Sequence, residues 1–433
     1  MAQCDTGGTK MSDLSVVHLT QSDNEGGANR AAYRIHKNLQ SIGLHSTFHV
    51  GRKHLDDSSV VAAHLPGAGL PVSDVIAYLN ARKLRSYPRK LATPFSPVGL
   101  RYGQLSARLI SEADVICAHW IAGAFLNFRQ LVAIRKPIVW RLSDIWPFSG
   151  GCHYPGSCDR FEHGCGSCPQ LGSDTDEDLS RAGIEARRSA FARLDLTIAA
   201  PSRWIAGLAR RSSLFGDRRI EHIPTGVDLN VFRPRDRMEA RRRFGWPENG
   251  RIVLFGALGA TEDPRKGYAH LLKAIELVTS SGRKDLTLVV FGGVVAAAAN
   301  SIGGFPIFHL GQVNSEELLS FVYSAADVLM APFLEDNLPN VVIEAIACGT
   351  PVVAFEAGGI PDAIEHGVNG YLAPIGSDAD LANALLMALD HVGDELRASA
   401  RKTAVETFDI TSCSRAYGAL FRDLTGVHRK SNE

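Results

Sequence analysis

The sequence predicts an α/β protein with two doubly wound, Rossmann-like domains that face a central cleft. Three observations support this prediction. Short β-rich runs alternate with helical stretches along the chain, which is typical of parallel sheets. The alternation begins again after the Arg- and Pro-rich segment 232–247, which we interpret as a linker. A chain of 433 residues is also too long for one ordinary domain.

The first half is expected to form one sheet whose strands are separated by helices. A strand at 14–19 is followed by a glycine pair and a helix over 28–42. Further strands are expected at 45–50, 114–118, 137–142, 196–200 and 220–223. We expect this domain to span 12–230, with a Cys-rich insertion at 150–170.

The second half repeats the pattern over 231–405. Strands are expected at 251–255, 286–291, 328–330 and 351–354, and helices at 268–280, 315–325 and 339–348. Segment 294–300 is Ala-rich and indicates a short helix or loop. The tail, 378–424, has the pattern of two or three amphipathic helices, and we expect 406–433 to pack back on the first domain.

The composition is that of a globular protein without a strong charge bias. Apolar residues make up 45% and charged residues 21%, and the formal net charge is zero. A nucleic-acid partner is not expected, because such proteins usually carry a basic excess. No run of about 18 apolar residues occurs and the first residues lack the apolar core of a signal peptide, so we expect a cytoplasmic protein.

Gly26 and Gly27 lie between the first predicted strand and helix. Glycine lets backbone N–H groups approach an anion, and the start of a helix favours negative charge, so this turn is a candidate phosphate site. The alternative is a tight turn with no ligand, since the full dinucleotide fingerprint GxGxxG is absent.

A carboxylate-rich segment marks the second half. Asp336 follows a predicted strand, and seven residues separate it from Glu344, which lies on the following helix. An acid on such a helix can accept both hydroxyls of a ribose. The loop that contains Asn337 and Leu338 would offer backbone N–H groups at the helix start. The alternative, a helix with solvated acids, does not explain why acids and turns fit one pattern.

This segment resembles the donor-binding motif of the family-4 glycosyltransferases of the GT-B fold. That motif has an acid, seven residues, Glu-Ala and a Cys-Gly-x-Pro turn. Here Asp336 and Glu344-Ala345 are followed by Cys348-Gly349-Thr350-Pro351, and later by Gly358-Gly359-Ile360-Pro361-Asp362. The resemblance implies that Glu344 binds the donor ribose and that Asp336 or Glu335 contacts the donor sugar. The family often has Glu where this chain has Asp336.

The pair Arg265-Lys266 is the candidate site for the donor diphosphate. It follows the strand at 251–255 and precedes a helix, where cations can stabilise the charge of a leaving diphosphate. In the family the Lys-Gly element contacts the diphosphate, which assigns Lys266. The second basic residue of the family is missing from Leu258–Thr261, and Arg265 is its candidate substitute. The alternative is a solvated basic turn.

His119 and Asp144 are the candidates of the first domain. Each follows a predicted strand directly, and the carboxyl ends of parallel strands carry the ligand site. The resemblance places a histidine near the donor sugar, where His119 would support oxocarbenium charge. Asp144 would meet the acceptor hydroxyl. The alternative for His119 is a structural histidine beside Trp120.

Four of the 8 cysteines crowd into the insertion: Cys152, Cys158, Cys165 and Cys168. The spacing of the last two is the CxxC knuckle of structural zinc sites, and four thiolates would form a closed, non-catalytic site. His153 and His163 are reserve ligands. An iron–sulfur cluster uses the same ligands, and unpaired or disulfide-linked cysteines are the alternative without a metal.

Segment 80–101 is a candidate membrane contact. It combines six cationic side chains with Leu, Tyr and Phe, and such a segment can lie on an anionic bilayer. The cations are Arg82, Lys83, Arg85, Arg89, Lys90 and Arg101. A solvated helix and loop is the alternative.

The resemblance implies a retaining transfer of a sugar from a UDP- or GDP-sugar to a glycan or lipid-linked acceptor, without a catalytic metal. Cell-surface polysaccharide synthesis is the commonest setting of the relatives. A nucleotide-sugar epimerase of the same fold is one alternative. A silent, zinc-stabilised nucleotide-sugar-binding protein is the other.

Overall fold

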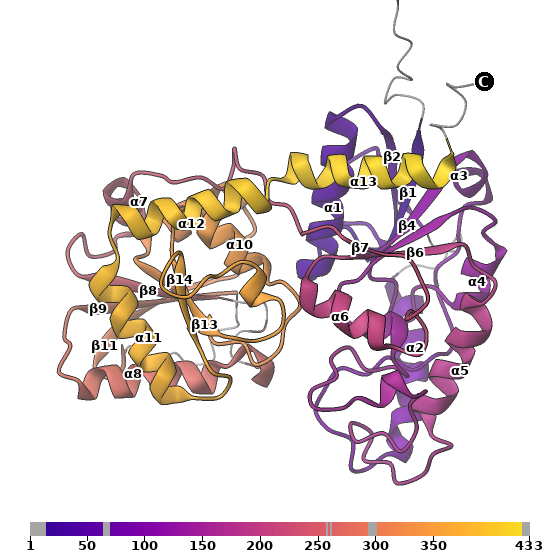
Figure 1. Cartoon of the computed structure of the whole chain (residues 1–433), viewed down its shortest axis with the longest axis horizontal. Coiled ribbons are helices and arrows are strands. Elements are labelled where there is room, and N and C mark those ends of the chain that lie inside the picture. Colours follow the sequence, from indigo (N-terminus) through magenta and orange to yellow (C-terminus); the bar gives the residue numbers. More distant parts are fainter. Residues whose placement is uncertain (1–13, 64–69, 257–258, 260–261, 293–300, 427–433) are drawn as a thin grey trace, which may run out of the picture. The chain divides into compact units, whose positions relative to one another are not determined.

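The computed structural model describes residues 14–63, 70–256, 259, 262–292 and 301–426 (Figure 1). The predicted Ala-rich segment 294–300 lies outside these residues. The chain divides into two compact units. One contains the residues up to Pro201, Ile205–Ile223 and the residues from Thr411 onward, and the other contains Ser202–Trp204 and Pro224–Ile410.

The first unit contains a parallel sheet in the order β3-β2-β1-β4-β5-β6-β7. Its strands are β1 (Ser15–Ser22), β2 (His45–Arg52), β3 (Val60–Ala62), β4 (Val115–Ala118), β5 (Ile138–Arg141), β6 (Leu196–Ala200) and β7 (Ile220–His222). The order reverses between β1 and β4, so the chain leaves these neighbouring strands in opposite directions. Such a switch point is the usual ligand site of a doubly wound sheet.

Helices from distant parts of the chain complete this unit. They are α1 (Gly26–Ser41), α2 (Leu70–Ala81), α3 (Ala107–Glu112), α4 (Phe128–Ala133), α5 (Leu179–Phe191), α6 (Arg203–Arg211) and α13 (Ile410–Thr425). From Thr411 onward, α13 lies with the first unit. Its Tyr417 is fully buried near Cys117 of β4 and Arg141 of β5, which places the helix over the sheet.

The second unit contains the sheet β10-β11-β9-β8-β12-β13-β14, parallel except for the β10–β11 pair. Its strands are β8 (Arg251–Gly256), β9 (Leu286–Phe291), β10 (Ser301–Ile302), β11 (Phe305–Gly311), β12 (Val328–Ala331), β13 (Val352–Phe355) and β14 (Gly370–Ala373). This order reverses between β8 and β12. Two doubly wound sheets confirm the predicted fold class.

The helices of the second unit follow its strands along the chain. They are α7 (Arg237–Phe244), α8 (Tyr268–Ser280), α9 (Glu316–Ala325), α10 (Asn340–Ala347), α11 (Asp378–His391) and α12 (Asp394–Thr407). The interpretation of 232–247 as a linker was wrong in part, because α7 occupies its centre. Asp236 caps this helix by accepting from the Glu239 amide, and Gly245 ends it with a φ of 65°.

A buried carboxylate ties α7 to the sheet. Asp327, fully buried, directly precedes β12. It accepts from Arg241 Nη2 at 2.6 Å, from Arg237 Nη1 at 2.9 Å and from the Ile252 amide of β8 at 2.7 Å. A buried carboxylate needs such partners, because its loss of hydration is not otherwise compensated. The network therefore holds β8 beside β12 at the base of the second sheet.

Replacing Arg241 by methionine should lower the free energy of unfolding of the second unit by about 3–5 kcal/mol, because Asp327 loses its most buried cation. Asp390→Ala, which breaks the solvent-exposed pair with Arg283, should cost at most about 1 kcal/mol. Urea unfolding of both variants measures the difference. Equal losses would contradict a central role for the Asp327 network.

Candidate functional site

The segments that follow β8 and β12 meet at the switch point of the second sheet. The first ends in the 3-10 turn η5 (Pro264–Lys266), and the second carries the acids. Lys266 Nζ lies 2.6 Å from Asp336 Oδ2. Two candidates that are 70 residues apart in the sequence are thus in direct contact at the ligand-binding edge of the sheet.

Lys266 is held close to the acidic segment by the glycine that follows it. Gly267 has a φ of 71°, and a Cβ there would lie 1.7 Å from the Pro332 carbonyl oxygen. No other residue fits so close to that backbone. The Lys266 ammonium also lies 4.7 Å from the centroid of the Phe333 ring. Its position is therefore set by packing on both sides.

Arg265 has a different environment. Its Nη2 lies 2.6 Å from Asp263 Oδ2, and its carbonyl accepts from the Leu334 amide at 2.8 Å. Arg265 therefore helps to join the two segments, while Lys266 makes the contact with the acid.

The acidic loop is buried and braced. Asp336 is 9% exposed, and Asn337 and Leu338 are buried beside it, whereas Glu335 is only half-buried. Asn337 Oδ1 accepts from Ser202 Oγ at 2.6 Å. These contacts hold Asp336 beneath the surface, with its carboxylate bonded to Lys266, and leave Glu335 nearer to solvent.

Two glycines after β13 pack against this loop. A Cβ on Gly358 would lie 1.7 Å from the Asp336 carbonyl oxygen, and one on Gly359 would lie 1.8 Å from that of Asn337. The Gly359 amide also donates to the Asp336 carbonyl at 3.2 Å. The close approach explains why glycines occur at this position, and it fixes the height of the acidic loop over the strand ends.

Glu344 lies on α10 and is 4% exposed. Its Oε2 accepts from the Tyr323 hydroxyl of α9 at 2.8 Å. The start of α10 has no side-chain cap, because Pro339 precedes it, and the Val342 amide donates to the Pro339 carbonyl at 3.0 Å. The start of a helix favours a bound anion. A cation, a helix start and a fixed carboxylate thus follow one another at this edge of the sheet.

In the first unit, the glycine pair begins α1. Gly26 has a φ of 80°, and the N-cap residue Glu25 makes no side-chain cap bond. The preceding turn is held by Ser22, whose Oγ accepts from the Glu25 amide at 3.1 Å. The phosphate role of Gly26 and Gly27 stays a prediction.

His119 is 1% exposed and does not reach solvent in this structure. Its Nε2 lies 2.9 Å from Nδ1 of His18, a residue of β1 that the sequence analysis did not single out. Burial lowers the pKa of both imidazoles well below the ordinary value, so both are neutral near pH 7. The Nδ1 of His119 has no hydrogen-bond partner among the described residues. The contact with a sugar stays a prediction.

Asp144 organises the start of the insertion. Its Oδ2 accepts from Trp120 Nε1 at 3.0 Å and lies 2.7 Å from His153 Nδ1. Its Oδ1 accepts from the Trp146 amide at 2.9 Å. The carboxylate is 6% exposed and bonded on both oxygens, so contact with an acceptor hydroxyl stays a prediction.

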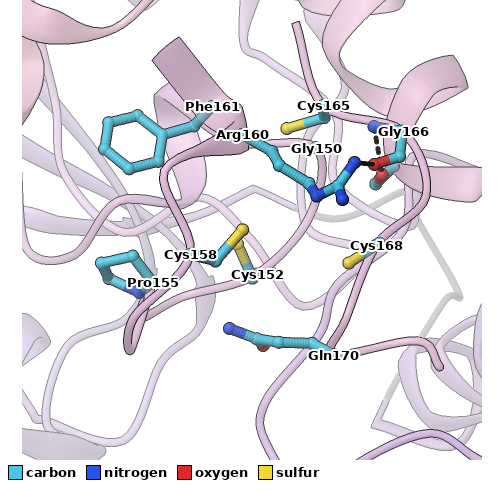
Figure 2. A pocket seen from close by; sticks show the side chains of 11 residues that line it. Gly150, Cys152, Pro155, Cys158, Arg160, Phe161, Cys165, Gly166, Cys168 and Gln170 are labelled. Atoms are coloured by element: carbon cyan, nitrogen blue, oxygen red, sulfur yellow. Dashed lines mark hydrogen bonds between the residues drawn. The ribbon is translucent and has the colours of Figure 1, made fainter. Parts of the chain in front are cut away.

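The four predicted metal ligands of the insertion, which we call the insertion cysteines, line one small pocket (Figure 2). They are Cys152, Cys158, Cys165 and Cys168, and all are free thiols. The reserve ligands are not part of it. His153 bonds through both ring nitrogens, to Asp144 and to Ser96 Oγ at 2.8 Å, and His163 is exposed.

The predicted membrane segment joins an exposed apolar surface on α2. Val75 and Tyr78 of this helix are more than half exposed, and Leu91 and Leu100 follow in the basic segment. We call these four residues the α2 patch. Arg85 stacks on Tyr78 with its Cζ 5.2 Å from the ring centroid. In the described part of the chain, no helix has the length and apolarity that crossing a bilayer requires.

Residues 250–391, within the second unit, match the family model described as "Glycosyl transferases group 1". D-inositol 3-phosphate glycosyltransferase of Mycobacterium leprae is 33% identical over 202 residues, which cover 43% of this chain and 44% of that protein. The D-inositol 3-phosphate glycosyltransferase of Mycobacterium tuberculosis (strain F11) is 30% identical over 222 residues, which cover 50% of this chain and 46% of that protein. The match therefore spans less than half the length of these curated relatives.

Solved structures are similar along nearly the whole chain. Sucrose-phosphate synthase from Thermosynechococcus elongatus has a TM-score of 0.68 at 18% identity, covering 96% of this chain and all of the other. Anabaena Alr3699/HepE in complex with UDP-glucose has a TM-score of 0.63 at 18% identity, covering 95% and 100%. At such identities the likeness shows the fold, and it supports the GT-B class.

Gly358→Ala should destabilise the second unit more than Gly376→Ala does. Both glycines have a positive φ, so both variants carry backbone strain of about 1–2 kcal/mol. A Cβ at Gly376 meets nothing within 4 Å, whereas one at Gly358 displaces the acidic loop and should cost about 1–3 kcal/mol more. Urea unfolding compares the two. Equal stabilities would show that the loop is not held by the close approach.

Proposed function

We propose that this chain is a retaining glycosyltransferase that moves a sugar from a UDP- or GDP-sugar to a glycan or lipid-linked acceptor, in cell-surface polysaccharide synthesis. The observation that carries the proposal is the contact between Lys266 and Asp336, directly before the helix that bears Glu344. All three lie in the segment that matches the glycosyl transferase model. UDP-glucose is bound by one structural neighbour, which supports a nucleotide-sugar donor.

In this proposal the second unit binds the donor. The Glu344 carboxylate, already oriented by Tyr323, accepts the ribose hydroxyls. The diphosphate lies at the start of α10 and takes Lys266 as its cation, which shifts Lys266 from Asp336. Asp336, or the more exposed Glu335, is then free to accept hydroxyls of the donor sugar.

The chemistry follows from the charges. Breaking the bond from the sugar to the diphosphate moves negative charge onto the leaving group, and a preorganised ammonium stabilises that charge more in the transition state than in the ground state. Lys266 supplies this charge without a catalytic metal, and Arg265 adds to the local positive potential. In a retaining transfer the leaving phosphate accepts the proton of the acceptor hydroxyl, so no protein nucleophile is required.

We also propose that the reaction takes place in the cytoplasm, with peripheral contact to the inner membrane face. The α2 patch and the cations of segment 80–101 support this part of the proposal, because apolar and basic side chains together bind anionic bilayers. A lipid-linked acceptor would be presented at that surface.

The donor is identified by measuring nucleotide release from a panel of UDP- and GDP-sugars. Wild type should turn over one donor, and Lys266→Ala should lower its kcat about 10²- to 10³-fold through loss of charge stabilisation. Glu344→Gln should mainly raise KM, because ribose binding is the same in the ground and transition states.

Lys273→Ala, an exposed lysine on α8, is the matched control and should leave turnover unchanged. Nucleotide binding without turnover, even with acceptors supplied, would favour a silent binding protein. Conversion of the donor sugar without nucleotide release would favour an epimerase.

Membrane contact predicts co-sedimentation with vesicles that contain phosphatidylserine but not with phosphatidylcholine vesicles, and weaker binding at high salt. Val75→Asp should abolish this binding, because it places a negative charge on the exposed face of α2. Met387→Asp, at an exposed apolar residue of the second unit, is the control. Equal binding of the two variants would contradict the assignment.

A further inference from the structure

The insertion cysteines line one small pocket. Figure 2 shows all four around a single pocket, which Pro155, Arg160 and Gln170 also line. The cavity among them measures about 10 Å³, which is room for roughly one water-sized sphere. An iron–sulfur cluster, with several iron and sulfide ions, needs much more space. The size of the pocket therefore favours a single metal ion.

Backbone N–H groups lie near two of the cysteine sulfurs. The Gly150 amide hydrogen-bonds to the Cys165 sulfur, and the amides of Gln170 and Leu171 bond to the Cys168 sulfur. Hydrogen bonds from N–H groups favour the charged form of an acceptor. Burial acts in the opposite sense and is the larger effect, raising the pKa of Cys165 to about 12. The thiols thus have partners for a negative charge, and a bound cation would complete them.

A buried arginine, Arg187, lies near the insertion cysteines. Arg187 of α5 is fully buried, and its Nε and Nη2 have no hydrogen-bond partner among the described residues. Its guanidinium stacks on Trp146 at 4.6 Å and on Phe128 at 4.9 Å, measured from Cζ to the ring centroids. Its charge interacts with the Cys152 and Cys165 thiols and with the Asp144 carboxylate. A buried cation of this kind requires nearby negative charge.

We propose that the insertion cysteines bind one zinc ion as a closed four-thiolate site and that Arg187 is the buried counter-ion of this site. Zinc displaces the thiol protons to solvent as its bonds to sulfur form. Four thiolates and one Zn²⁺ carry a net charge of −2, so the guanidinium lowers the cost of burying the complex. This inference does not depend on the proposed function.

Net charge also distinguishes this site from a second cluster of potential metal ligands. Among the described residues, the only three potential ligands whose ligand atoms all lie within 4.8 Å of one another are His18, Cys117 and His119. A zinc ion there would give a net charge of +1 beside the cation Arg141, which interacts with Cys117. The insertion cysteines must turn further inward to share one ion, but their charge balance is favourable.

Such a site would hold the insertion against segment 80–101. The apolar contact is between Phe95 and the pair Cys168 and Leu171. The Leu91 amide donates to the Gln170 carbonyl at 2.9 Å, and the Ser96 amide donates to the Gly151 carbonyl at 2.8 Å. Metal binding at the cysteines would therefore order the chain from Leu91 to Ser96 as well.

The test is the metal content of the purified full chain, measured for zinc and iron together. We expect one zinc per chain in wild type and in Cys117→Ser, and its loss in Cys165→Ser. Loss in Cys117→Ser with retention in Cys165→Ser would move the site to the histidine cluster. Iron in place of zinc, or no metal and a disulfide among the insertion cysteines, would overturn the proposal.

A cysteine variant could fail to fold, so two further measurements leave all four insertion cysteines in place. Cobalt in place of zinc should give the intense sulfur-to-metal charge-transfer and d–d absorption of a tetrahedral four-thiolate site, and a spectrum without thiolate bands would contradict the assignment. Arg187→Met should weaken zinc retention about 10- to 100-fold, whereas Arg187→Lys should keep more of it. Equal retention in both variants would remove the counter-ion role.

Discussion

Parallel pairing of β8 with β12 is the constraint on which the candidate donor site depends. Val328 pairs with Val253 in this ladder, and the two crossovers leave in opposite directions, so the segments after the strands converge at one edge. Lys266 and Asp336 meet there because Gly267 and Gly358 let backbones approach to distances that no side chain allows. Below the strands, Asp327 bonds to the Ile252 amide and keeps the ladder in register.

Charge is compensated differently at three places in the chain, and the difference separates structure from candidate function. Asp327 has its cations in place and needs nothing further. Lys266 is paired with an acid that a bound diphosphate can replace, since both partners lie at the ligand-binding edge. Arg187 has aromatic faces but no bonded anion at two of its nitrogens. The first arrangement stabilises a fold, and the other two are suited to taking up a charged ligand.

Much of this architecture could be predicted from the sequence, because buried parallel strands such as β8 and β12 are continuous apolar runs between helical patterns. The strands β3, β10 and β14 were not predicted; each has only two to four residues and lies at an edge of its sheet. The strand β11 was missed because Pro306 and Gly311 interrupt its pattern. Helix α7 was not predicted, because segment 232–247 is rich in Arg and Pro and was interpreted as a linker. Lys266 and Asp336 were predicted from motifs, whereas Tyr323, His18 and Arg187 were not, because only tertiary packing gives them partners.

A crystal structure of the full chain with UDP or GDP bound would test the central claim most directly, because it locates the nucleotide relative to named side chains. We predict that the ribose lies on Glu344, that the diphosphate lies at the start of α10, and that Lys266 turns from Asp336 towards the phosphates. A nucleotide bound elsewhere, with the contact between Lys266 and Asp336 intact, would contradict it.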